Sequence, residues 1–171
     1  MKTKKRSLFF LAIGTILLAA LDQLTKWAAI TYLKGNLAFP IIKGVFELSY
    51  LENRGSAFGL MQGKRYFFLA MTAVVLIIIP YIYSKMPLSP RFRLLRLDAV
   101  FFLAGALGNA IDRVIRGYVV DFFYFSLIDF PVFNVADIYV SVSAFALFLL
   151  MFFYYKEEDL NQIELTRRKS E

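Results

Sequence analysis

Residues 66–84, YFFLAMTAVVLIIIPYIYS, lie between Arg65 and Lys85 and contain no charged side chain. A helix rises about 1.5 Å per residue, so a run of this length crosses roughly 30 Å of hydrocarbon. Three more apolar segments of similar length occur, roughly at 8–30, 97–115 and 135–155. The sequence therefore predicts an all-α membrane protein with four transmembrane helices.

The first of these segments has a second interpretation. The basic stretch 2–6 precedes an apolar run from Leu8 to Leu21, which is also the pattern of a cleaved signal peptide. Apolar character resumes at Trp27 and continues to Leu33, which favours a retained span. Cleavage stays the alternative.

The composition agrees with a membrane protein and limits the chemistry. The chain has 171 residues, of which 59% are hydrophobic, whereas soluble domains are nearer 45–50%. Four spans and their loops use up this length, so we expect one domain over residues 1–171. The chain has no Cys and no His, which excludes disulfides, Ser-His-Asp and Cys-His catalysis and His/Cys zinc sites. Hydrolysis would need carboxylates, a lysine-activated serine or a metal held by oxygen ligands.

The basic residues predict the orientation of the spans. Of the 20 Lys and Arg residues, twelve fall in the two tails and in segment 85–96, and seven fall in the opposite loops and their borders. Cytoplasmic segments carry the excess of Lys and Arg, so we expect both termini in the cytoplasm. The net charge of +7 then reflects topology, and no nucleic-acid partner is expected. Segment 45–51 alternates as a strand does, and 118–133 is rich in β-branched and aromatic residues, so a small extracytoplasmic β-rich cradle is expected. The tail after Tyr155 reads as a short solvated helix or a disordered end.

Polar residues from separate parts of the chain converge at the outer membrane face. Charged side chains inside spans cost about 2.5–3.5 kcal/mol near the centre, so each requires a reason. If both termini are cytoplasmic, the following residues lie at a similar depth near the outer face: Asp22, Lys26, Asn53, Arg54, Asn109, Asp112, Arg113, Asp121, Asn134 and Asp137. This convergence predicts a functional site.

Simpler interpretations exist for several of these residues. Asp22 and Lys26 are spaced i,i+4 and can neutralise one another, and Asp112-Arg113 can be an interfacial pair at a helix end. Asp121 can be an ordinary loop carboxylate. Asp137 can be a carboxylate favoured by a helix N-terminus, but its apolar flanks favour a functional role.

Three other functions compete with carboxylate catalysis. Lys26 could activate a hydroxyl, but the nearest is Thr25, which points elsewhere on a helix. Four aspartates, Asp22, Asp112, Asp121 and Asp137, could bind a metal, although Lys26 and two arginines disfavour a cation there. A small transporter could use Asp22, Asp112 and Asp137 as a relay, but it would place polar groups across the membrane depth and show paired half-repeats.

Four motifs, in order, resemble the bacterial lipoprotein signal peptidases (signal peptidase II). They are Asp22-Gln23-Leu24-Thr25-Lys26, Asn53-Arg54-Gly55-Ser56-Ala57-Phe58-Gly59, Gly105-Ala106-Leu107-Gly108-Asn109-Ala110-Ile111-Asp112-Arg113, and the pair Gly117-Tyr118-Val119-Val120-Asp121-Phe122 with Phe133-Asn134-Val135-Ala136-Asp137. The resemblance covers nearly the whole chain. Its one departure is Ser56, where Ala is commoner, and no consequence is expected.

The resemblance implies a fold, an activity and a site. It implies an inner-membrane aspartic endopeptidase, without cofactor or metal, that cleaves a prolipoprotein just before its diacylglyceryl-Cys, near the outer face. Asp121 and Asp137 match the catalytic pair. The supporting or substrate-binding residues are Asp22, Lys26, Asn53, Arg54, Gly55, Asn109, Asp112, Arg113 and Asn134. A monomer in contact with membrane lipids is expected, and cyclic peptide inhibitors of the family should occupy the pocket of the pair.

The chemistry of two adjacent carboxylates fits this assignment. Two such groups separate their pKa values and hold one proton between them. The ionised carboxylate takes a proton from water while the protonated one donates to the scissile carbonyl. Phe58 and Leu60 are proposed as a lid over the site.

Overall fold

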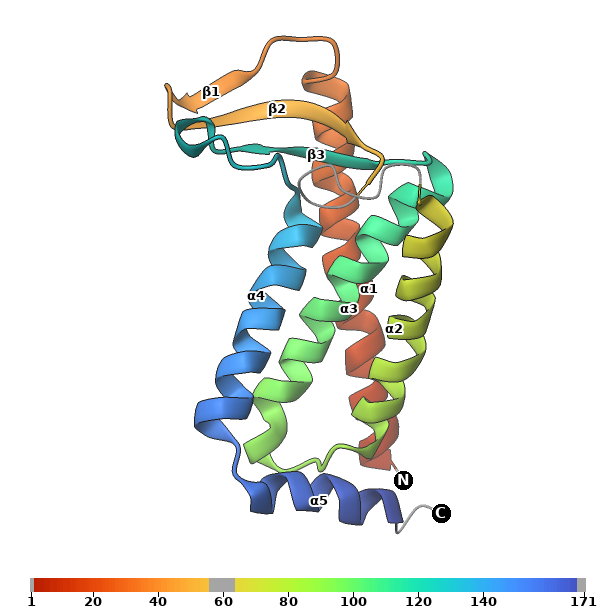
Figure 1. The fold of residues 1–171 in the computed structure, drawn as a ribbon. Coiled ribbons are helices and arrows are strands. Elements are labelled where there is room, and N and C mark those ends of the chain that lie inside the picture. Colours follow the sequence, from red (N-terminus) through yellow and green to blue (C-terminus); the bar gives the residue numbers. More distant parts are fainter. Residues whose placement is uncertain (1, 56–63, 169–171) are drawn as a thin grey trace.

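The computed structural model describes residues 2–55 and 64–168, and its four long helices form a bundle capped at one end by a small sheet (Figure 1). The helices are α1 (Lys2–Tyr32), α2 (Arg65–Lys85), α3 (Arg93–Ile115) and α4 (Val135–Leu149). All four are long and apolar enough to span a membrane, α4 together with the π-helical turn η4 (Leu150–Tyr154). The four predicted spans are therefore confirmed.

The helix boundaries differ from the predicted ones at the end opposite the sheet. α1 begins at Lys2 rather than near residue 8, and α3 begins at Arg93 rather than near residue 97. Charged residues at a span end stay helical because their backbone bonds continue into the interface while their heads reach water. Both termini lie at this end of the bundle (Figure 1).

The cap is a three-stranded antiparallel sheet in the order β1-β2-β3, so the bundle is not purely helical. Its strands are β1 (Phe39–Ile42), β2 (Phe46–Asn53) and β3 (Val119–Tyr124). Between β2 and β3, Leu51 pairs with Asp121, and Asn53 pairs with Val119. The predicted β-rich cradle is confirmed, although the part after β3 forms a 3₁₀ turn, η3 (Ser126–Ile128), before α4. Residues far apart in sequence thus reach one layer above the helix ends.

α3 is the central helix, and its small residues let α4 and α1 approach it closely. A Cβ added at Gly105 would lie 2.5 Å from the carbonyl oxygen of Ala136, and one at Gly108 would lie 2.5 Å from Asp22 Oδ2. Small residues at helix contacts are the usual device in membranes, where helices gain little from apolar burial. This contact brings the start of α4 against α1 and α3.

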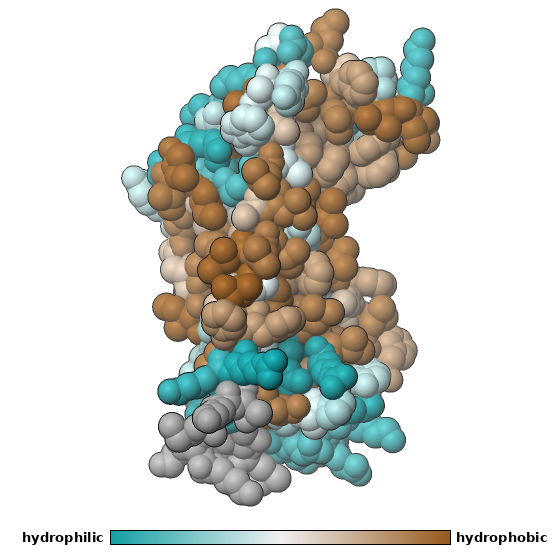
Figure 2. Space-filling model, turned by 180° about the vertical axis from the view of Figure 1, so that it is seen from behind, coloured by the Kyte–Doolittle hydropathy of each residue, from teal (hydrophilic) through white to brown (hydrophobic). Residues whose placement is uncertain are grey.

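The outer surface of the bundle is apolar. Figure 2 shows a brown, hydrophobic middle zone with teal, hydrophilic regions at both ends of the molecule. A short last helix, α5 (Glu157–Arg168), lies across the end opposite the sheet (Figure 1). Of the two predictions for the tail after Tyr155, a short helix or a disordered end, the helix is confirmed. Arg91 Nη2 forms an ion pair with Asp159 Oδ2 of α5 at 2.9 Å. The rings of Tyr155 and Phe92 stack with their centroids 5.4 Å apart. These contacts hold α5 and the residues just before it against the turn that precedes α3.

Candidate active site

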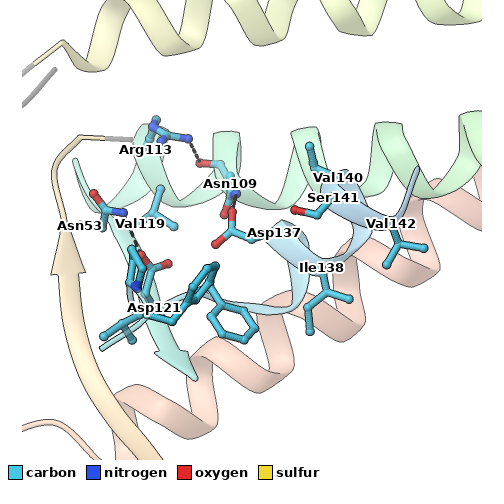
Figure 3. A pocket seen from close by; sticks show the side chains of 14 residues that line it. Asn53, Asn109, Arg113, Val119, Asp121, Asp137, Ile138, Val140, Ser141 and Val142 are labelled. Carbon is cyan, nitrogen blue, oxygen red and sulfur yellow. Dashed lines mark hydrogen bonds between the residues drawn. The ribbon is translucent and has the colours of Figure 1, made fainter. Parts of the chain in front are cut away.

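A cavity of about 490 Å³ lies where the sheet meets the adjacent ends of α3 and α4 (Figure 3). Its polar lining comes from four elements: Asn53 ends β2, Asn109 and Arg113 belong to α3, Asp121 lies in β3 and Asp137 in α4. The predicted convergence of these five residues is therefore present.

Asp121 is a buried carboxylate, with 1% of its surface exposed. Its Oδ2 accepts a hydrogen bond from Asn53 Nδ2 at 2.8 Å, and its Oδ1 accepts one from Asn134 Nδ2 at 2.6 Å. These two bonds lower its pKa. Burial, followed by the negative charge of Asp137, outweighs them and raises the pKa of Asp121 from its ordinary 3.8 to about 7. Asp121 is therefore not an ordinary loop carboxylate.

Asp137 has two structural functions, one for each oxygen. It occupies the first turn of α4, where Oδ2 accepts the backbone N–H of Asn134 at 3.1 Å. Asn134 in turn accepts the backbone N–H of Asp137 at 3.0 Å, which completes a capping box. The other oxygen, Oδ1, accepts a bond from Asn109 Nδ2 at 2.8 Å within the cavity (Figure 3). The helix-terminus interpretation of Asp137 is thus correct but accounts for only one oxygen.

The two carboxylates, below called the dyad, belong to one hydrogen-bond network. Asn134 Nδ2 donates to Asp121 and, at 3.2 Å, to Oδ1 of Asn109, whose Nδ2 donates to Asp137. Two asparagines therefore connect both members of the dyad.

Behind this network lies an ion cluster centred on Lys26, which is fully buried together with Asp22 and Asp112. Lys26 Nζ lies 3.0 Å from Asp22 Oδ2 and 2.9 Å from Asp112 Oδ2, and it donates to Asn109 Oδ1 at 2.8 Å. Arg116 makes a further ion pair with Asp112. The cluster holds two negative and two positive charges, which is the arrangement under which buried ions are tolerated.

The cluster also connects α4 and β3. Asp22 Oδ1 accepts the backbone N–H of Ala136 at 2.8 Å, and Asp112 Oδ2 accepts that of Val120 at 3.1 Å. Asp22 and Lys26 do neutralise one another, as the simpler interpretation stated, but they also position the dyad's neighbours.

Two predictions require correction. Asp112 pairs with Lys26 and Arg116 rather than with Arg113, so the interfacial-pair interpretation is wrong. Arg54 does not line the cavity. Its exposed side chain lies 3.7 Å from Glu52 instead.

The four aspartates also divide into two sets, Asp22 with Asp112 and Asp121 with Asp137. Within residues 2–55 and 64–168, no three carboxylates gather as a metal site would require. Lys26 is bound to Asp22 and Asp112 and not to Thr25, whose hydroxyl donates to the Asp22 carbonyl at 2.7 Å.

Arg113 lies at the rim of the cavity, over the chain that follows β2. Its Nη2 donates to the carbonyl of Gly55 at 3.1 Å, and its guanidinium lies 4.6 Å from the Phe68 ring centroid. Gly55 N–H donates to Asn53 Oδ1 at 2.9 Å, so Gly55 holds both polar residues in place. The proposed lid residues Phe58 and Leu60 lie outside the described residues.

Sequence reasoning missed two groups of residues around the site. Gln23 and Arg116 complete the buried cluster: Gln23 Nε2 donates to Asp112 Oδ1 at 3.2 Å, and Arg116 donates to Gln23 Oε1 at 3.3 Å. The i,i+4 spacing of Asp112 and Arg116 was a usable signal. The apolar wall of the cavity was also missed, and it comprises Val119, Phe130, Pro131, Val132, Phe133, Ile138, Val140 and Val142, with Ser141 beside them.

Comparison with known proteins identifies relatives along most of the chain. A family model described as signal peptidase (SPase) II matches residues 14–153. The lipoprotein signal peptidase of Caldanaerobacter subterraneus subsp. tengcongensis is 47% identical over 134 residues, which cover 78% of this chain and 89% of the relative. That of Brevibacillus brevis is 41% identical over 145 residues, covering 85% and 95%. A bacterial membrane enzyme solved by the in meso method at 2.3 Å superposes with a TM-score of 0.75 at 28% identity, covering 86% of this chain and 92% of that one. With its fold and most of its length matched, the chain belongs to the signal peptidase II family.

Proposed function

We propose that this protein is an aspartic endopeptidase that removes the signal peptide from prolipoproteins, just before the diacylglyceryl-modified Cys. Removal of that signal peptide is the activity of the family to which the chain belongs. The aspartic mechanism is carried by one observation: a buried carboxylate with a pKa near 7, Asp121, shares a hydrogen-bond network and a cavity with Asp137. The transporter alternative has no support, because two of its three relay carboxylates are neutralised in the buried ion cluster.

The dyad would divide the chemistry between its members. Asp121, with its raised pKa, holds the shared proton. Asp137, in the first turn of α4 and on the same cavity, serves as the base. It takes a proton from water as the water oxygen attacks the scissile carbonyl, and Asp121 donates its proton to the carbonyl oxygen. Collapse of the tetrahedral intermediate then breaks the C–N bond: the proton on Asp137 passes to the leaving amine, and a hydroxyl of the intermediate returns a proton to Asp121 as the carboxyl product forms.

The cavity lining would position the substrate. Arg113 and Asn53 offer N–H donors at its rim for backbone carbonyls of an extended peptide. The apolar wall, from Phe130 to Phe133 and along α4, suits the lipid-modified residue and its apolar neighbours. The cyclic peptide inhibitors expected from the family resemblance would occupy the same cavity.

The membrane placement follows from charge. Lys and Arg concentrate in the two tails and in segment 85–96, which favours both termini in the cytoplasm. The sheet and the dyad would then lie at the outer face of the bacterial inner membrane. We expect a monomer, surrounded by lipid along its apolar middle zone.

The test is cleavage of a diacylglyceryl-modified prolipoprotein by purified protein in the presence of EDTA. Wild type should cleave, whereas Asp121→Asn and Asp137→Asn should lose nearly all turnover. Asp129→Asn is the matched control, because Asp129 is an exposed aspartate between β3 and α4 whose left-handed backbone, φ 49°, asparagine also adopts. Near-normal cleavage by either dyad variant, or inhibition of wild type by EDTA, would contradict the proposed mechanism.

A further inference from the structure

A second cavity continues from the dyad cavity along α3 and α4, towards the end opposite the sheet. Its volume is about 320 Å³, and Val142 of α4 lines both cavities. The lower cavity is otherwise lined mainly by apolar residues, among them Leu97 and Phe101 of α3 and Leu149 of α4. We call the two together the α3/α4 groove. It leads from the dyad down the lipid-facing side of the bundle.

One charged side chain, Asp98, lies in the lower half of the α3/α4 groove. Within residues 2–55 and 64–168, no group donates a hydrogen bond to the Asp98 carboxylate, and no cationic side chain forms an ion pair with it. Asp98 lies within the third span, about 8 Å along the helix from Arg93. A carboxylate in a span is a functional candidate by default, because its desolvation requires a compensating partner.

Neighbouring cations are directed elsewhere. Arg91 is paired with Asp159, and Arg96 donates to the backbone carbonyls of Pro87 and Ser89. Arg93 lines a different cavity, on the side of α1. Asp98 is therefore left to attract a positive charge that enters the groove from outside the protein.

The spacing between Asp98 and the dyad matches the design of a signal peptide. Asn109, which contacts Asp137, follows Asp98 by 11 residues, or about 16 Å along α3. A signal peptide has a basic segment followed by an apolar segment of about 7–15 residues, which spans roughly 10–22 Å as a helix. A substrate with its cleavage site at the dyad would thus bring its basic segment to the level of Asp98.

We infer that the α3/α4 groove holds the apolar helix of the substrate's signal peptide, and that Asp98 binds a Lys or Arg of its basic segment. Asp98 is then a specificity-determining residue, far from the reacting bond. The inference rests on the proposed function, because only a signal-peptide substrate brings this charge pattern to the groove.

The test pairs two enzymes with two substrates. Wild type and Asp98→Asn are compared on a lipid-modified prolipoprotein with Lys in its basic segment and on a matched substrate with Gln there. For the Lys substrate, Asp98→Asn should raise KM roughly three- to tenfold, with kcat nearly unchanged. For the Gln substrate it should change neither constant. Asp98→Lys should in turn favour a substrate with Glu at that place.

The controls separate this inference from the proposed function. Asp129→Asn, with its aspartate outside the groove, should leave KM unchanged for both substrates, and thermal unfolding should confirm that Asp98→Asn is folded. Equal effects on both substrates, or no effect on either, would overturn the role of Asp98 while leaving the peptidase intact. A changed oligomeric state of Asp98→Asn would also overturn the inference, because a second copy of the chain would then be what occupies the α3/α4 groove. Failure of wild type to cleave either substrate would refute the proposed function itself.

Discussion

Replacement of Asp121 by Asn should abolish activity yet stabilise the protein at alkaline pH. The pKa of Asp121 is about 7 in the folded protein against an ordinary 3.8. Between these two values the folded state holds a proton that the unfolded state has released, so the free energy of unfolding falls as the pH rises. At about 1.4 kcal/mol per pKa unit, the ionised carboxylate destabilises the fold by about 4 kcal/mol above pH 7.

The hydrogen bonds of Asp121 reduce the expected gain. Asn53 and Asn134 each donate an N–H to one of its oxygens, and an amide in its place offers only one oxygen. The loss of one bond costs about 1–2 kcal/mol. The variant should therefore be more stable than wild type by about 2–3 kcal/mol at pH 8 and less stable by about 1–2 kcal/mol near pH 4. For a chain of this size the difference at pH 8 corresponds to roughly 4–12 °C in Tm.

Thermal unfolding in detergent, followed by circular dichroism at pH 8 and near pH 4, measures this difference. Wild type, Asp121→Asn and the control Asp129→Asn are compared at each pH, so that other titrating groups cancel. A Tm for Asp121→Asn below that of wild type at pH 8 would refute the reasoning. So would a difference of the same size at both pH values, because the destabilisation would then not come from ionisation.

Three further outcomes are expected. The kcat for prolipoprotein cleavage should fall as the pH rises above about 7, because Asp121 loses the shared proton; a rate that stays level to pH 9 would contradict this. Gly105→Ala should lower Tm by an amount equivalent to about 1–3 kcal/mol, because its Cβ would meet the Ala136 carbonyl oxygen at 2.5 Å, and an unchanged Tm would show that α4 can move away. Lys26→Met should destabilise by about 3–5 kcal/mol, because it leaves the buried carboxylate of Asp22 without an ion-pair partner, whereas Asp112 keeps Arg116. Adding Asp22→Asn should recover part of that loss in the same unfolding assay, and a further loss would show that charge is not the cause.

Residue patterns predicted the spans and the convergence of polar groups. The two wrong predictions, for Asp112 and for Arg54, conflict with the periodicity of a helix and of a strand, respectively. Neighbours on a helix project about 100° apart, so Asp112 could not face the same partners as Arg113. Alternation along the end of β2 places Arg54 with Glu52, on the face opposite Asn53, so Arg54 could not share the cavity.

Other features depend on tertiary packing that no local pattern carries. The close contact of α3 with the start of α4 decides which carbonyl lies against Gly105. The apolar wall of the dyad cavity forms only when the loop after β3 folds beside α4. Burial and the charge of Asp137, neither readable from the chain, set the pKa of Asp121.

The buried ion cluster explains how the dyad's asparagines are oriented. An asparagine can present either its oxygen or its nitrogen, but the ammonium of Lys26 carries only donors. Because Lys26 donates to Asn109 Oδ1, Nδ2 of that amide is left to face Asp137. The same oxygen accepts from Asn134, which leaves Asn134 in the orientation that donates to Asp121. A charge-balanced cluster behind the cavity thus holds N–H donors toward both carboxylates, while the net negative charge remains on the dyad, where it favours retention of a single shared proton.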